Sequence, residues 1–79
     1  MPQLDLKLGV TNNSVVWLQN YLIQAQSGSQ ATKLKEVGPT GYFGPLTQAA
    51  LAEYQAKFGI SPAVGYYAPL TRAYIQNSN

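Results

Sequence analysis

The sequence predicts an all-α fold, a compact three-helix orthogonal bundle preceded by an extended N-terminal arm. Apolar residues recur at helical spacing in three segments, and no two segments make a convincing pair of strands. The connections between these segments are long for an up-and-down bundle, which favours helices that cross at steep angles under packed loops. The chain of 79 residues has no cysteine, so helix packing has to stabilise it. We expect a single domain over residues 1–79, with a core of about residues 4–76.

The N-terminal part is expected to form the arm and then a first helix. Residues 4–9, LDLKLG, alternate apolar and polar side chains, as in an extended segment laid across a hydrophobic surface. Residues 11–14, TNNS, are rich in capping side chains, so a helix is expected from there to about Gln26. Trp17 lies away from its apolar stripe, and either packs under a neighbouring loop or offers an exposed aromatic surface to a ligand. The stripe consists of Val15, Leu18, Leu22 and Ala25.

One ten-residue motif occurs twice in the second half of the chain. Residues 41–50 read GYFGPLTQAA and residues 65–74 read GYYAPLTRAY; we call them the first and the second motif. Six of the ten positions are identical, which indicates a repeated structural unit, here a turn followed by a helix. Phe43 and Tyr67 hold equivalent positions and are expected to be packed.

Each motif is expected to begin a helix at its proline. Proline has no backbone N–H, and at the first helical position this N–H would have no partner within the helix. The second helix is expected from Pro45 to about Phe58, with Gly59 as its C′ glycine, and Thr47 is expected to hydrogen-bond back to the start of that helix. The third is expected from Pro69 to about Gln76.

The remaining segments carry weaker signals. Residues 27–32 have the composition of a loop, and residues 33–37 could form either a helical turn or a short extended piece. A tight turn is expected at residues 38–41, and a crossing loop at residues 60–64 with Ile60 and Val64 as apolar anchors. Residues 77–79 are expected to fray.

Composition excludes several classes of function. The chain has no histidine and no cysteine, which argues against the usual zinc sites, histidine-dependent triads and cysteine nucleophiles, so we expect no metal and no cofactor. Its three carboxylates lie on separate segments, and Ser14 and Thr47 lack a base, so we expect no catalysis. The five cations are scattered, which argues against nucleic-acid binding. The carboxylates are Asp5, Glu36 and Glu53.

Neither a bilayer-spanning run nor a signal peptide is visible in the sequence. A complete gene product of this kind would be cytoplasmic, whereas for a module of a longer protein the missing signal means nothing. The chain starts and stops close to the elements it needs, which favours a module.

The residues taken together resemble the small peptidoglycan-binding domain that is appended to many bacterial cell-wall hydrolases. Three blocks carry the resemblance, in the right order and spacing, over about residues 4–76. Three positions depart from the family pattern, with Asn12 for a glycine, Thr40 for an aspartate and Ala68 for the last motif glycine, and residues 27–40 form a longer loop than in many members. The matching residues are Leu6, Gly9, Val15, Leu18, Gln19, Leu22, Gly41, Phe43, Gly44, Thr47, Ala50, Leu51, Tyr54, Gln55, Gly59, Ile60, Gly65, Pro69 and Thr71.

This resemblance implies a non-catalytic anchor that holds a parent enzyme or surface protein on bacterial peptidoglycan, at the cell envelope or secreted within a larger protein, and we expect a monomer. A shallow groove near the two motifs would bind the polymer, because aromatic faces stack on sugars and arginine or helix N-termini suit acidic stem peptides. The same side chains could instead only pack. A different possibility is a protein-interaction or pro-segment-like module that never touches the wall. The candidate ligand residues are Tyr42, Gln48, Tyr66, Tyr67 and Arg72.

Overall fold

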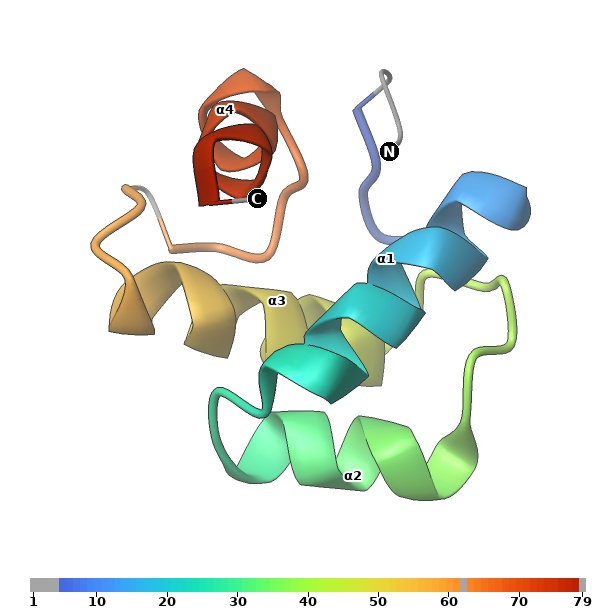
Figure 1. Cartoon of the computed structure of the whole chain (residues 1–79). Helices are drawn as coiled ribbons and strands as arrows, with labels where there is room; N and C mark the ends of the chain where they lie inside the picture. Colours follow the sequence, from blue (N-terminus) through green and yellow to red (C-terminus); the bar gives the residue numbers. More distant parts are fainter. Residues whose placement is uncertain (1–4, 62, 79) are drawn as a thin grey trace.

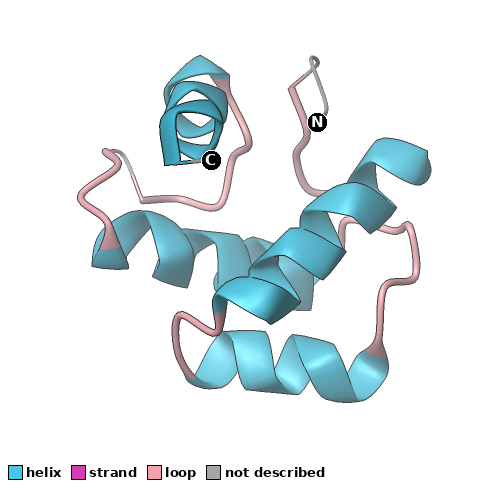
Figure 2. Cartoon of the chain, in the orientation of Figure 1, coloured by secondary structure: helices cyan, strands magenta, loops and turns pink. Residues whose placement is uncertain are grey.

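Four α-helices pack together in the part of the chain that the structure describes (Figure 1). The computed structural model describes residues 5–61 and 63–78. The helices are α1 (Asn13–Ala25), α2 (Ser29–Val37), α3 (Pro45–Lys57) and α4 (Pro69–Ser78). Within the described ranges no strand forms and the helices are joined by loops (Figure 2). The all-α prediction is confirmed, and the predicted count of three helices is wrong.

Helix α1 begins and ends close to its predicted limits. The Asn12 side chain caps it by accepting a hydrogen bond from the Val15 backbone N–H at 3.1 Å. Gln26 ends it in the left-handed conformation, with φ of 50°. Three of the four predicted stripe residues are fully buried and Ala25 is partly buried, so the apolar stripe faces the core as expected.

Helix α2 begins within residues 27–32, which were expected to be loop, and continues through residues 33–37, for which a helical turn was one of two alternatives. It buries only Ala31 and Leu34. Its first turn is instead capped from α3, where the Glu53 carboxylate accepts hydrogen bonds from the backbone N–H groups of Gln30 and Ala31, each at 3.2 Å. A carboxylate at a helix N-terminus satisfies free N–H groups and interacts favourably with the helix dipole. A contact with another helix therefore stabilises α2.

Helices α3 and α4 begin at the two motif prolines, as predicted. Gly59 follows the end of α3 with φ of 72°, and the Ile60 N–H donates to the Gln55 carbonyl at 2.8 Å, which makes a Schellman ending. Helix α4 continues to Ser78, so the predicted fraying is not seen at residues 77–78. Leu4, Pro62 and Asn79, on which parts of the arm, loop and tail predictions fall, lie outside the described residues.

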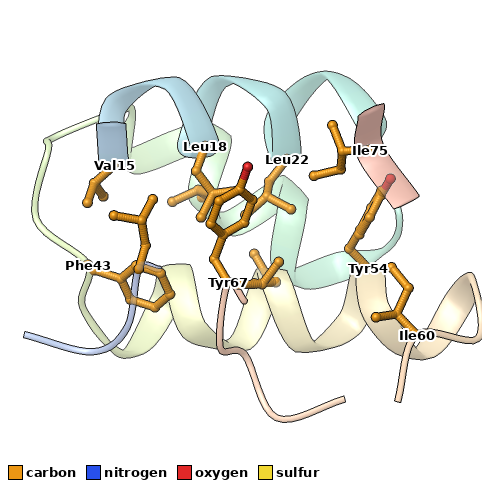
Figure 3. Close-up of a cluster of buried hydrophobic side chains, with 12 residues drawn as sticks. Val15, Leu18, Leu22, Phe43, Tyr54, Ile60, Tyr67 and Ile75 are labelled. Carbon is orange, nitrogen blue, oxygen red and sulfur yellow. The ribbon is translucent and has the colours of Figure 1, made fainter. Parts of the chain in front are cut away.

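The core lies between α1, α3 and the two motif turns. Figure 3 shows Phe43 and Tyr67, one from each motif, pointing in among the buried α1 side chains. Both are fully buried, as their equivalent positions predicted. Leu6 of the arm is also fully buried, which agrees with an arm laid on a hydrophobic surface.

Candidate functional site

The first motif turn is held by a buried glutamine from α1. The Gln19 Oε1 atom accepts a hydrogen bond from the Gly41 backbone N–H at 3.0 Å. Its Nε2 donates to the Tyr42 carbonyl at 3.0 Å and to the Thr47 hydroxyl at 2.9 Å. Gln19 is 1% exposed, so its amide is committed to the turn and to the first turn of α3.

The second motif turn is held by the same arrangement, with Gln55 of α3 in the place of Gln19. Gln55 Oε1 accepts from the Gly65 N–H at 2.9 Å. Its Nε2 donates to the Tyr66 carbonyl and to the Thr71 hydroxyl, both at 2.9 Å. The sequence repeat is therefore a structural repeat. The first unit consists of α1, the first turn and α3, and the second of α3, the second turn and α4.

The sequence analysis named these two glutamines only as matches to the family pattern and assigned them no role in holding the turns. The expected bond from Thr47 to the start of its own helix gave this hydroxyl the wrong partner, because the structure pairs it with Gln19. A signal was present in the sequence. Gln19 follows Leu18 and Gln55 follows Tyr54, in each case on the helix that precedes a motif.

The N-terminal arm runs across both motif turns. Leu6 and Tyr67 exchange two backbone hydrogen bonds, of 2.9 and 2.8 Å. Further along the arm, the Phe43 N–H donates to the Val10 carbonyl at 2.8 Å, and the Gly9 N–H donates to the Phe43 carbonyl at the same distance. The arm thereby places the two turns side by side.

A shallow hollow lies at each motif turn, at the start of the following helix. The hollow of the first motif has a volume of about 330 Å³, and that of the second motif about 360 Å³. A third hollow, of about 450 Å³, lies between the arm and the second turn, where Lys7, Gln48 and Tyr66 line it. It shares Val64 and Tyr66 with the hollow of the second motif.

The structure separates the predicted ligand residues into exposed and buried groups. Tyr42 and Tyr66 are 49% and 40% exposed, and each lines the hollow of its own motif. Gln48 is partly buried and lies against the second turn. Tyr67 is fully buried, and burial raises the pKa of its hydroxyl to about 12. Its ring is part of the core and is not available to a polymer at the surface.

Arg72, the fifth predicted residue, is paired within the chain. Its guanidinium forms a salt bridge with the Asp5 carboxylate, and the Tyr66 hydroxyl donates a hydrogen bond to the same carboxylate at 2.8 Å. The guanidinium carbon also lies 5.9 Å from the centre of the Tyr67 ring. Asp5 thus fixes the side chains of two residues that the sequence analysis assigned to a ligand.

The pairing of Asp5 predicts a pH dependence of stability. Hydrogen bonds from Arg72 and from the Tyr66 hydroxyl hold the pKa of the Asp5 carboxyl below its usual 3.8. The carboxyl is therefore more acidic in the folded chain than in the unfolded one, so its stabilising contribution is present above about pH 4 and is lost as the pH falls through the folded-state pKa.

We expect Asp5→Asn to lower the melting temperature at neutral pH and to match wild type in strong acid. Thermal unfolding over a pH series measures this, with Glu36→Gln on exposed α2 as the control. A difference between Asp5→Asn and wild type that does not change with pH would contradict it.

Trp17 is partly buried and packs against the buried core from α1. Its ring stacks on that of Tyr21, with centroids 5.5 Å apart and planes 9° from parallel, and both rings are partly buried. Asn20 and Gln24 line a small hollow beside them. Trp17 is not at either motif turn, and the hollow of the first motif and that of the second do not include it.

Comparison with protein-family models identifies the family. Residues 11–73, most of the chain, match the family model described as "Putative peptidoglycan binding domain". The chain belongs to this peptidoglycan-binding domain family. Searches of the curated proteins and of the solved structures found no significant match.

The three carboxylates of this peptidoglycan-binding domain lie at different places and have different partners. Asp5 binds Arg72, Glu53 caps α2, and Glu36 is exposed on α2. No three metal-ligating side chains come together in the part of the chain that the structure describes. None of the described helices has both the length and the apolar character needed to cross a bilayer.

Proposed function

We propose that this domain is a non-catalytic module that anchors a parent protein to bacterial cell-wall peptidoglycan through the surface at the two motif turns. The family match is the observation that carries the proposal. The domain would act at the cell envelope, as part of a larger secreted or surface protein, and as a monomer.

The geometry of the motif turns supports this role. Tyr42 and Tyr66 are exposed beside hollows, and a buried glutamine holds the backbone carbonyl of each. The Tyr66 ring is also held through its hydroxyl by Asp5, and the Tyr42 ring lies against Gly44. An aromatic ring held in place beside a hollow can pack on a sugar face without first losing conformational freedom. Gln48 and Lys7 add polar groups to the third hollow. Arg72 contributes by positioning Asp5 and, through it, the Tyr66 ring.

Exposed apolar side chains keep the protein-interaction alternative open. Val64 and Leu70, at the second motif, are 56% and 65% exposed, and Leu8 of the arm is 47% exposed. Such side chains also suit a neighbouring protein domain. The co-sedimentation experiment described next separates wall binding from binding to a protein partner.

Co-sedimentation with purified insoluble peptidoglycan tests the proposal. We expect the folded wild type to pellet with the polymer and Tyr66→Ala to bind about two- to ten-fold more weakly, because an aromatic contact contributes about 0.5–1.5 kcal/mol. Arg72→Ala should weaken binding less than Tyr66→Ala, since Arg72 is already paired. Lys33→Ala, at an exposed position of α2, is the control for a surface substitution. Circular dichroism checks that each variant is folded.

Two outcomes would count against this proposal. A folded wild type that pellets with none of several wall chemotypes would show that the domain does not bind the wall, and would favour a protein partner. Pelleting that neither Tyr66→Ala nor Tyr42→Ala changes would place the binding surface away from the motif turns.

A further inference from the structure

The two motif hollows are copies of one another. Seven lining positions of the first hollow recur in the second at the constant sequence interval of the repeat, and the volumes differ by less than a tenth. Both hollows are backed by the amide of a buried glutamine, which bonds to equivalent atoms in each. Three pairs of identical residues line both hollows, and all six are exposed except Leu46, which is partly buried. The pairs are Tyr42 and Tyr66, Pro45 and Pro69, and Leu46 and Leu70.

The walls of both hollows are uncharged. Each has a tyrosine ring, a proline and a leucine, and no Asp, Glu, Lys or Arg lines either one. The cation within the second motif, Arg72, is bound to Asp5. Lys7 lines only the neighbouring third hollow, so a carboxylate of a stem peptide would lose its hydration within these two hollows without gaining a cation. An N-acetylated sugar, with apolar ring faces, an acetamido methyl group and no charge, fits these walls better.

The two hollows are close enough for one strand of sugars to reach both. Leu6 pairs with Tyr67 and Thr11 pairs with Tyr42, so five residues of arm separate the two turns. At about 3.4 Å per residue, this limits their separation along the arm to roughly 17 Å. The second turn also packs directly on the first part of α3, since a Cβ atom at Gly65 would lie only 2.5 Å from the backbone carbonyl oxygen of Gln48. Gln48 directly follows Thr47, which lines the first hollow.

We propose that the domain has two equivalent subsites, one at each motif turn, which bind N-acetylated sugar residues of one glycan strand and leave the stem peptides outside. This inference rests on the proposed function and specifies which part of the polymer is recognised. A glycan strand repeats along its length, so one strand can occupy both subsites. Once one subsite is occupied, binding at the second becomes intramolecular, and this raises the overall affinity.

The two copies differ in how the tyrosine is held. A Cβ atom at Gly44 would lie 2.9 Å from Cε2 of Tyr42, so the Tyr42 ring covers the turn backbone, and a side chain at that position would displace it. In the second motif Ala68 stands at this place, and the Tyr66 hydroxyl binds Asp5 instead. The two subsites therefore share most of their lining but hold the tyrosine in different ways.

Titration of the ¹⁵N-labelled domain with peptide-free glycan tetrasaccharides from peptidoglycan tests the two subsites. We expect shifts of backbone amides in both turns, at residues 44, 46 and 47 and at residues 68, 70 and 71, and weaker effects from an isolated stem pentapeptide. Tyr42→Ala should abolish the shifts at the first turn alone and Tyr66→Ala those at the second alone. Each variant should bind the tetrasaccharide about ten-fold more weakly, whereas a disaccharide should lose less. Tyr66→Ala removes the hydrogen bond to Asp5 as well as the ring, and Asp5→Asn shows the effect of weakening that contact alone. Lys33→Ala is the control for an unrelated surface substitution.

Shifts confined to one turn would overturn the two-subsite proposal, and shifts caused by the stem pentapeptide but not by the glycan would overturn the choice of sugar. The pelleting assay with intact peptidoglycan separates these outcomes from failure of the proposed function. A wild type that pellets while its glycan shifts stay at one turn remains a wall anchor with a single site. A wild type that neither pellets nor shifts fails both proposals.

Discussion

Gly65→Ala is expected to lower the free energy of unfolding by about 3 kcal/mol or more, a large part of the stability of a domain of this size. Two costs add. Gly65 has φ of 79°, a left-handed conformation that costs an L-residue about 1–2 kcal/mol. The new Cβ would also lie 2.5 Å from the backbone oxygen of Gln48, and relieving that contact requires the second turn to move off α3. Urea unfolding followed by the fluorescence of Trp17, the single tryptophan, measures the change.

Gly59→Ala is the matched control for the backbone term. Gly59 also has positive φ, of 72°, but no atom lies within 4 Å of the position its Cβ would take. This variant should lose only about 1–2 kcal/mol. Equal losses for Gly59→Ala and Gly65→Ala would show that the contact with Gln48 adds nothing.

Gln55→Ala is expected to destabilise the domain by about 3 kcal/mol, the combined effect of a core cavity and of buried polar groups left without partners. The side chain is 1% exposed and makes three hydrogen bonds, to the Gly65 N–H, the Tyr66 carbonyl and the Thr71 hydroxyl. Gln55→Glu keeps the acceptor for Gly65 but removes both donated bonds and adds a charge, so it should also destabilise strongly. The same urea titration measures both.

Gln24→Ala, on the exposed side of α1, should change stability by less than about 0.5 kcal/mol. If Gln55→Ala behaved like Gln24→Ala, the second turn would be held by something other than the glutamine. Gln19→Ala should reproduce the effect of Gln55→Ala at the first turn, because the two side chains bond to equivalent atoms.

The elements that the sequence predicts well carry their own local signals. Pro45 and Pro69 begin α3 and α4, and Asn12 caps α1, as their local chemistry requires. Helix α2 has weak local signals, with nine residues, two of them buried, and no side-chain cap of its own. Its cap comes from Glu53, more than twenty residues away, and no local pattern reveals such a partner.

The same distinction applies to the candidate site. The repeat predicts correctly that Tyr67 is packed, because Phe43 holds the equivalent position. It could not show that Arg72 is occupied, because its partner Asp5 lies at the other end of the sequence. Tyr66 and Tyr67 are adjacent and identical in type, and in the structure Tyr67 pairs with Leu6 of the arm and is buried while Tyr66 is exposed.

Helix α3 belongs to both units, and this sharing has a consequence for how the two turns can move. The first turn leads into the start of α3, and Gln55, near its end, holds the second turn. A single rigid helix therefore sets the spacing between the turns, and that spacing cannot change while α3 stays folded. In a protein with two sites on a flexible linker, binding at both sites loses linker entropy. Here that loss already occurs during folding, so a polymer reaching both turns would meet a preorganised surface.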